Sequence, residues 1–344
     1  MNQRSTKTLP APALSVQHLS VEYATDSGPA EALKDICFTI ESNQRVGLVG
    51  ESGCGKSTLL KAIMGVVATN GTVKSGQIRL KDTDLLSLDE NSRRKTRWRD
   101  ISMITQSALN ALNPVHRVGD QIMEVIRAHQ PVSRNEARTR VQELFTLVGV
   151  DPGRTGDYPH QFSGGMRQRV VIAMALALEP QIILADEPTT ALDVIVQDQI
   201  FTRIRELQEK LSFALILVTH DLSLVAENCT HMIVMYAGVI VEMGPTREII
   251  KNPRHPYSIG LRNAVPVPGS NRDPISIPGS PPDLTHHQPG CLFSARCPLA
   301  DDICHRTSPP VRQGKENRMV RCHKDGETVL FAQKAFRQSA WKLS

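Results

Sequence analysis

Residues 50–58 read Gly50-Glu51-Ser52-Gly53-Cys54-Gly55-Lys56-Ser57-Thr58, and they decide the fold of this 344-residue chain. A short apolar run, Val46 to Val49, precedes the stretch, and apolar residues at helical spacing follow it. A strand, a glycine-rich loop and a helix in this order are the context of a phosphate-binding P-loop. A simple glycine-rich turn is the alternative, but it would not require the flanking strand and helix. The stretch therefore predicts that the chain binds a nucleoside triphosphate.

Each part of the stretch has an expected role in holding phosphate. Glycines let backbone N–H groups turn inward around an anion, because no Cβ obstructs its close approach. The helix that opens at Lys56 adds unpaired N–H groups and the positive end of its dipole. We expect Lys56 to reach the outer phosphates and the Ser57 hydroxyl to bind Mg²⁺.

The composition is that of a soluble globular protein, with 40% apolar residues and a net charge of +5. No apolar run approaches the ~20 residues needed to span a bilayer. Residues 1–12 are polar and lack the apolar segment of a secretory signal. The mild charge argues for neither nucleic acid nor a membrane surface, and the 4% of aromatic residues disfavours single-strand stacking. We expect a cytosolic protein, or one docked on a membrane through another subunit.

Apolar patterns predict an α/β fold with a parallel-sheet core. Upstream of the P-loop, residues 14–23 and 32–40 alternate around a polar loop at 25–29, which indicates an antiparallel β element. Positions 121–148 show helical spacing with a break near Pro131. Continuous apolar runs are typical of strands that helices cover on both faces, and they occur at residues 101–105, 182–185, 214–218 and 232–235.

The character of the sequence changes after Gly244, where prolines recur and the periodicity fades. We place a domain boundary there. Residues 13–245 are expected to form one nucleotide-binding domain, and residues 246–344 an irregular C-terminal extension.

Two adjacent carboxylates end one of the predicted buried strands. Asp186 and Glu187 follow Ile182 to Ala185, so both should lie at the carboxyl edge of the sheet, where open α/β sheets bind ligands. Asp186 is expected to hold the Mg²⁺ of the triphosphate, and Glu187 to act as the general base for the attacking water. A surface Asp-Glu pair is the alternative, and the P-loop in the same chain disfavours it.

A second phosphate-binding pattern occurs at Ser163-Gly164-Gly165-Met166, just before an apolar helical run. A serine, two glycines and a helix start provide an array of free N–H groups. The simpler interpretation is a helix capped by Ser163. Because the chain has two such ends but only one P-loop lysine, one end is expected to serve a nucleotide held by a second subunit.

The order of these motifs resembles that of an ABC transporter ATPase. The P-loop comes first, followed by Gln106, Ser163-Gly164-Gly165, Asp186-Glu187, Asp193 and His220. The resemblance implies a P-loop NTPase of the ABC ATPase type, with a parallel-sheet core, an antiparallel β subdomain and an α-helical signature subdomain. Two cassettes of this family pair head to tail, and each ATP lies between one P-loop and the partner's signature motif.

The resemblance also implies roles for individual residues. Gln106 would contact Mg²⁺ and the attacking water, and His220 would hydrogen-bond the γ-phosphate. Tyr23 would stack on the adenine, although a strand core residue is the alternative at this position. Residues that would contact the partner's ATP are Ser163, Gly164, Gly165, Met166 and Asp193.

The signature and the C-terminal part narrow the resemblance. Phe162 and Met166 stand where the family usually has leucine and glutamine, and Met166 has no side-chain donor. Phe-Ser-Gly-Gly-Met-Arg-Gln-Arg is the form that peptide and nickel importer ATPases have, and residues 252–257 and the cysteine-rich end are similar to theirs. The whole chain resembles the D-type ATPase of a dipeptide or oligopeptide importer. This implies two membrane permease subunits and, indirectly, a periplasmic solute-binding protein.

Four cysteines lie close together near the C-terminus. Gaps of five, six and seventeen residues separate them, so the short Cys pairs of zinc knuckles are absent from the sequence. Clustered thiols in a reducing cytosol indicate metal rather than disulfides. Four thiolates on long loops suit a [4Fe–4S] cluster, which some importers of this family are known to have in this region. A zinc site and free thiols are the alternatives; the predicted ligands are Cys291, Cys297, Cys304 and Cys322.

These observations predict an ATP-hydrolysing subunit that powers peptide or related solute import from the cytoplasmic face of the bacterial inner membrane. A nucleic-acid ATPase of the same superfamily is one alternative, but residues 59–162 have neither sustained heptads nor cysteines. A non-hydrolysing regulatory subunit is the other, and Glu187 and His220 disfavour it. We expect no nucleic-acid partner.

Overall fold

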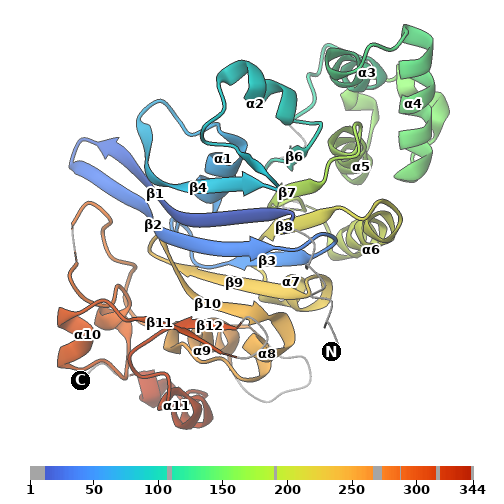
Figure 1. Cartoon of the computed structure of the whole chain (residues 1–344). Coiled ribbons are helices and arrows are strands. Elements are labelled where there is room, and N and C mark those ends of the chain that lie inside the picture. The colour runs from blue at the N-terminus through green and yellow to red at the C-terminus, as the bar shows by residue number, and fades with distance from the viewer. Residues whose placement is uncertain are drawn as a thin grey trace, which may run out of the picture.

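The computed structural model of the chain describes residues 12–106, 111–189, 192–265, 273–286, 288–314 and 318–341. Two sheets organise it, and helices gather at one end and beneath them (Figure 1). None of the described helices combines the length and the apolar content that crossing a membrane requires.

An eight-stranded sheet forms the centre of the molecule. Its strand order is β11-β12-β10-β9-β3-β8-β7-β6, and the five strands from β9 to β6 run parallel. The bounds are β3 (Arg45–Val49), β6 (Ile101–Ile104), β7 (Ile182–Asp186), β8 (Ala214–Val218), β9 (His231–Tyr236) and β10 (Val239–Pro245). The predicted α/β fold with a parallel-sheet core is thus confirmed.

The continuous apolar runs form strands because both of their faces are buried. Along β7, Ile182 and Leu184 point into the core shared with the antiparallel sheet, whereas Ile183 and Ala185 point into the core beneath the helices. Successive side chains of a strand alternate between faces. A polar residue at any of these positions would therefore be buried on one side or the other.

A second, antiparallel sheet of four strands covers one face of the central sheet. Its order is β2-β1-β4-β5, with bounds Leu14–Thr25, Gly28–Ile40, Gly71–Leu80 and Thr83–Asp84 for β1, β2, β4 and β5. The first two strands are longer than the alternation predicted, and only Asp26 and Ser27 join them. Thr25 pairs with Gly28 directly, and the φ of +112° at Gly28 permits the tight turn.

The helices before residue 246 lie along the central sheet and beyond its β6 edge. Their bounds are α1 (Lys56–Met64), α2 (Glu90–Thr96), α3 (Val118–His129), α4 (Arg134–Leu147), α5 (Gly164–Ala175), α6 (Val194–Leu211) and α7 (Leu222–Asn228). The predicted break near Pro131 separates α3 from α4, and Ser133 starts α4 with a capping box to Glu136. Helix α2 was not predicted, because its seven residues bury no side chain and show no apolar period.

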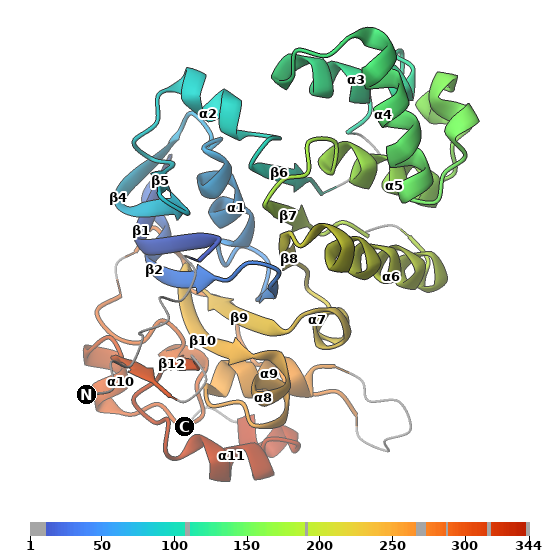
Figure 2. The same cartoon turned by 45° about the vertical axis from the view of Figure 1, so that its right-hand side comes forward.

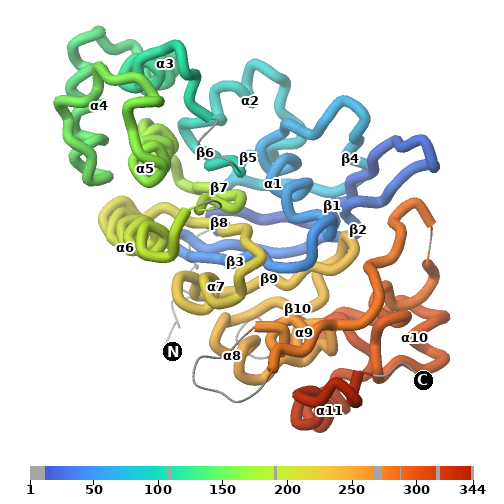
Figure 3. The backbone as a smooth tube through the Cα atoms, turned by 180° about the vertical axis from the view of Figure 1, so that it is seen from behind, coloured from blue at the N-terminus to red at the C-terminus, as the bar shows by residue number. Residues whose placement is uncertain are grey.

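The C-terminal extension has more regular structure than its prolines suggested. It contains α8 (Thr246–Lys251), α9 (Pro256–Asn263), α10 (Asp302–Arg306), β11 (Val311–Gln313), β12 (Met319–Arg321) and α11 (Thr328–Lys334). These elements have eight residues or fewer, which is too short for a visible period. Strand β12 pairs antiparallel with β10, so the extension enlarges the central sheet (Figures 1 and 2). Helices α8, α9, α10 and α11 lie together on the β10 side of the molecule, which Figure 3 shows from behind.

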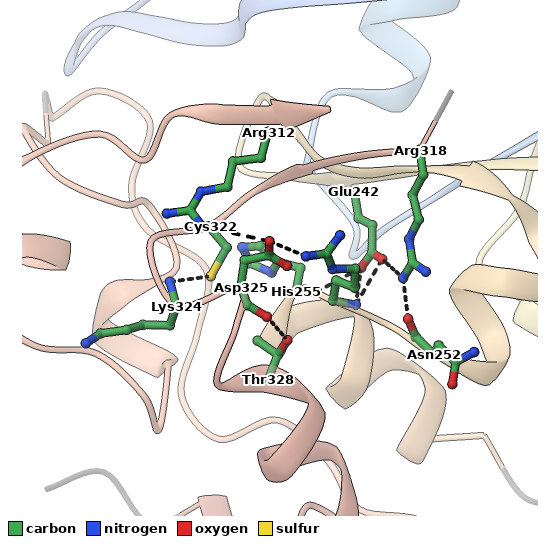
Figure 4. Close-up of polar contacts among 10 residues, drawn as sticks. Glu242, Asn252, His255, Arg312, Arg318, Cys322, Lys324, Asp325 and Thr328 are labelled. Atoms are coloured by element: carbon green, nitrogen blue, oxygen red, sulfur yellow. Dashed lines mark hydrogen bonds and ion pairs between the residues drawn. The ribbon is translucent and has the colours of Figure 1, made fainter. Parts of the chain in front are cut away.

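Buried ion pairs fasten the extension to β10. Glu242 on β10 is fully buried and accepts hydrogen bonds from the backbone N–H groups of Arg254 and His255 and from an Arg318 Nη at 2.8 Å. Arg254, whose N–H is held by Glu242, pairs within the extension with Asp325. Asp325 comes three residues after Cys322, and Figure 4 shows both of them near Glu242. The loop that contains Cys322 is therefore fixed to the cassette.

Candidate functional site

Four adjacent parallel strands bring the predicted nucleotide residues to one edge. Strands β3, β8, β7 and β6 are neighbours in this order, and all point the same way. The P-loop follows β3, His220 follows β8, Glu187 follows β7 and Gln106 follows β6. Residues scattered over 170 positions thus meet at the carboxyl ends of the strands.

The P-loop has a backbone shape that requires glycine. Gly50 has a φ of +154°, and a Cβ there would lie 2.2 Å from the Met235 carbonyl oxygen. Gly55 has a φ of +104°, and its Cβ would lie 2.6 Å from the Ala32 carbonyl oxygen. Gly55 also precedes α1 without any side-chain cap, so the first N–H groups of the helix are left for another acceptor.

Lys56 lies inside the loop that it ends. Its ammonium donates to the carbonyl oxygens of Gly50 at 2.7 Å and Glu51 at 2.9 Å, and its side chain is nearly buried. The Cys54 thiol lies 3.6 Å from the same nitrogen. The single cation of the loop is therefore held where a phosphate oxygen would enter.

Two oxygen ligands for a hard cation lie next to this ammonium. The Ser57 hydroxyl lies near the carboxylate of Asp186, the last residue of β7. Burial raises the pKa of Asp186, whereas the Ser57 hydroxyl and the charge of Lys56 lower it. A hydroxyl and a carboxylate beside a phosphate cradle are the donor set that Mg²⁺ prefers.

Glu187 is held by the two other predicted residues. Its Oε2 accepts a hydrogen bond from Gln106 Nε2 at 3.2 Å, and its Oε1 lies 3.2 Å from His220 Nδ1. The backbone of Glu187 has a φ of +47°, which is uncommon for a residue with a Cβ. Its N–H donates to the Val218 carbonyl oxygen, and this bond helps to hold the strained conformation.

The signature residues lie at the start of α5, next to the start of α6. Ser163 caps α5 by accepting the Met166 N–H, and Asp193 caps α6 by accepting the Val196 N–H. A Cβ at Gly165 would lie 2.6 Å from Val196, so the two helix starts are packed together. The sulfur of Met166 accepts a hydrogen bond from Arg154 of the same chain.

Tyr23 lies on β1, opposite Ala30 on β2 and Gly71 on β4. Its ring is half-buried, and a Cβ at Gly71 would lie 2.6 Å from it, so the ring covers that glycine. One part of the ring is exposed and could stack on an adenine. The other part packs against the core between the two sheets, as the alternative of a strand core residue predicts.

The four C-terminal cysteines lie close enough to influence one another. The thiols of Cys291, Cys304 and Cys322 each raise the pKa of at least one other cysteine of the four, and the Cys291 N–H donates to the Cys304 carbonyl oxygen at 2.7 Å. Burial raises the pKa of Cys291 to about 11 and that of Cys322 to about 12. Backbone N–H groups also point at these sulfurs, including that of Lys324, which lies 3.3 Å from Cys322 Sγ.

The four sulfurs do not converge on one point. Within the described ranges, one group of three or more His, Cys, Asp or Glu side chains has all of its ligand atoms within 4.8 Å of one another, and it consists of His18, Asp35 and Cys37. The carboxylate of that group is already paired with a protein side chain, because Arg321 lies 3.1 Å from Asp35. The sulfurs are thus neighbours without the compact arrangement that a single ion needs.

One P-loop contact was missed by the sequence analysis. The carboxylate of Glu51 does not point into the loop but pairs with Arg296 of the extension, and the Glu51 N–H donates to the Tyr257 hydroxyl at 2.8 Å. In the sequence, Arg296 is an arginine inside the cysteine-rich segment, and nothing around it indicates that it pairs with a residue 245 positions earlier.

Comparison with known families identifies the class of this nucleotide site. Residues 33–190 match the family described as ABC transporter, and residues 241–304 match the family described as Oligopeptide/dipeptide transporter, C-terminal region. MJ0796, a bacterial ABC transporter cassette solved as a dimer, is 28% identical with a TM-score of 0.61, covering 68% of this chain and 99% of the cassette. This chain belongs to the ABC transporter ATP-binding proteins.

Curated relatives extend the similarity over nearly the whole chain. The oligopeptide transport ATP-binding protein OppD of Salmonella typhimurium is 43% identical, covering 93% of this chain and 97% of the relative. The dipeptide transport ATP-binding protein DppD of Bacillus subtilis is 44% identical, covering 90% and 93%. The resemblance to D-type peptide importer ATPases is confirmed.

Proposed function

We propose that this chain hydrolyses ATP to power the import of peptides or related small solutes across the bacterial inner membrane. The observation that supports this most is the single sheet edge where the P-loop, the Ser57–Asp186 pair and the Gln106–Glu187–His220 group meet. The relatives named for peptide transport support the substrate class. They do not favour a nucleic-acid ATPase or a non-hydrolysing regulatory subunit.

The chemistry is phosphoryl transfer to water, in which positioning and charge do most of the work. Residues 50–58 hold the triphosphate, with Lys56 released from the loop carbonyls to the phosphates. Ser57, Asp186 and Gln106 would hold Mg²⁺, which would neutralise phosphate charge. Glu187 accepts the proton of the attacking water, and His220 donates a hydrogen bond to the γ-phosphate.

A second cassette completes each site. Ser163, Gly164, Gly165 and Met166 offer the start of α5 to the partner's nucleotide, and Asp193 lies beside them. Val194 and Ile195, directly after Asp193, are 78% and 72% exposed, which suits a surface that a partner covers. A paralogous or an identical subunit fits equally. Two permease subunits would hold the pair peripherally on the cytoplasmic face of the membrane, with a solute-binding protein on the other side.

We assign residues 13–245 to the cassette and residues 246–344 to the extension. The boundary falls where β10 ends at Pro245 and α8 begins at Thr246. Pairing between β12 and β10 makes the extension a fixed part of the cassette surface rather than a tethered domain.

We assign a [4Fe–4S] cluster to Cys291, Cys297, Cys304 and Cys322. A polynuclear cluster accommodates sulfurs that are neighbours but not convergent, and backbone N–H groups at the sulfurs suit a thiolate-bound centre. Such a cluster would cross-link the loops. Anaerobic purification should give a brown protein with about four irons per chain. Colourless protein with stoichiometric zinc would favour zinc, and metal-free protein would leave free thiols.

Peptide uptake by cells tests the transport function. Cells that lack this chain should regain uptake of labelled di- and oligopeptides when the wild-type chain is supplied, but not with Lys56→Ala, because that variant leaves phosphate charge unmatched. A matched exposed control, Lys210→Ala on α6, should restore uptake fully. Uptake that never depends on the chain, for peptides or for nickel, would contradict the proposal.

A further inference from the structure

The P-loop is tied to the extension by a buried two-point ion pair. Arg296 Nη1 lies 2.8 Å from Glu51 Oε2, and Nη2 lies 3.0 Å from Oε1. The Arg296 side chain is 5% exposed and that of Glu51 25% exposed. Charge-assisted pairs with two parallel hydrogen bonds fix both the distance and the orientation of the groups that they join.

The guanidinium has its own fixed surroundings. Its Nε donates to the Pro278 carbonyl oxygen at 2.8 Å, and Nη1 lies 3.3 Å from the Tyr236 hydroxyl. Burial opposes the charge of Arg296, but the hydrogen bonds with Glu51 and Tyr236 raise its pKa. Arg296 directly precedes Cys297, so the cysteine-rich segment also supplies the positive charge that pairs with the P-loop residue Glu51.

The backbone of the same P-loop residue is held by a second residue of the extension. The Tyr257 hydroxyl accepts the Glu51 N–H at 2.8 Å. The Tyr257 ring packs against Tyr236 and Phe293, with centroids 4.7 Å and 5.4 Å away. Both the side chain and the main chain of Glu51 are therefore positioned from outside the P-loop.

We propose that Arg296 is a positioning residue for nucleotide binding: it holds the Glu51 carboxylate away from the phosphate cradle and neutralises it. A carboxylate left free in the P-loop would repel a triphosphate bound a few residues away. The C-terminal extension thereby sets the ATP affinity of the cassette. The inference rests on the proposed function only in taking ATP as the ligand of the P-loop.

A matched ion pair elsewhere separates this role from a merely structural one. Arg318 pairs with Glu242 at 2.8 Å, also between the extension and the cassette, and their side chains are 12% and 0% exposed. Glu242 lies on β10 rather than in the P-loop. Loss of the Arg318 pair should weaken the docking of the extension without placing a free carboxylate near the phosphates.

The test measures ATP binding and hydrolysis by the full-length chain. Arg296→Ala should raise the ATP Kd and KM about tenfold, the effect of losing one good charged hydrogen-bond interaction, with little change in kcat. Arg296→Lys, which keeps the charge but not the two-point geometry, should give an intermediate loss. Arg318→Ala should lower thermal stability and leave the ATP Kd within about twofold.

Removal of the freed carboxylate is the decisive readout. Arg296→Ala combined with Glu51→Gln should regain most of the lost ATP affinity, which a purely structural role does not predict. No recovery in the double variant, or unchanged affinity in both Arg296→Ala and Arg296→Lys, would overturn the inference. Wild-type protein that fails to bind ATP would instead refute the proposed function.

Discussion

The P-loop and the cysteine loops both surround an expected anionic group with backbone N–H donors, but they are built differently. The P-loop is nine consecutive residues whose shape is set by three glycines with positive φ between β3 and α1. The cysteines come from separate segments between residues 291 and 322, with Cys304 on α10, and burial raises the pKa of their thiols. The P-loop is complete before its ligand arrives, whereas the thiols must lose protons to bind a metal.

The comparison teaches that a contiguous motif holds most of its own geometry, with Glu51 as the exception in the P-loop. A dispersed motif depends instead on how its separate segments dock. Substitutions at the nucleotide edge should therefore change chemistry and leave the fold intact. Substitutions in the cysteine loops should change the stability of the extension first.

The largest effect is expected at Glu187. Glu187→Gln should lower kcat for ATP hydrolysis by about 10²–10⁴-fold, because the general base is lost. ATP binding should persist, since the P-loop is untouched, and the closed cassette dimer should accumulate. Phosphate release and nucleotide binding are the measurements, with Glu209→Gln on the exposed side of α6 as the control. Near-normal turnover by Glu187→Gln would remove this residue from the role of base.

Ser163→Arg should also lower kcat for ATP hydrolysis, by roughly 10²-fold. The arginine would block the start of α5, which is expected to position the partner's nucleotide. ATP binding to the isolated chain should be unchanged, because Ser163 is expected to contact the ATP of the other subunit. Mixtures of Ser163→Arg with Lys56→Ala chains should regain at most one composite site per dimer. Reduced ATP binding by the monomeric variant would place Ser163 at its own nucleotide and contradict the head-to-tail pairing.

Loss of one cysteine tests the dependence of the extension on its ligand. Cys322→Ser should abolish the bound metal and lower the unfolding midpoint of the extension by about 5 °C or more, because metal binding is also folding free energy. ATP binding should change much less. Cys229→Ala, outside both the C-terminal cysteines and the His18–Asp35–Cys37 group, is the control for metal content. Equal metal content in both variants would exclude Cys322 from the site.

Acid should weaken the extension through His255. Full burial lowers the pKa of His255 to about 3, and its Nδ1 accepts the Tyr257 N–H at the start of α9. In the unfolded chain His255 binds a proton more readily than in the folded protein. The contribution of neutral His255 to the free energy of unfolding is therefore fully present above pH 6.5 and is lost as the pH falls toward 3. The loss should be about 1.4 kcal/mol at pH 5.5. His255→Asn keeps a capping acceptor without titrating, so its stability should fall less between pH 7 and 5.5; equal slopes would exclude His255.

The sequence predicts those parts of the molecule whose structure is set by residues that are neighbours in the chain. Buried strands such as β8, residues 214–218, follow directly from apolar runs, and the P-loop follows from its glycines. The long-range contacts do not follow. Nothing at Glu51 or Arg296 indicates that they pair, and the short strand β12 has no alternation to reveal that it extends the central sheet. Such contacts depend on where separately folded segments dock, which a single sequence does not specify.

Strand β12 also covers the edge of β10, which would otherwise be prone to aggregation. Without it, β10 would present a row of unpaired N–H and C=O groups, the template on which strands of other molecules add. The outermost strand is instead β11, only three exposed residues long and bearing Arg312, which is a poor template for growth. A chain cut at Pro245 should therefore aggregate through its sheet even if the nucleotide edge were intact.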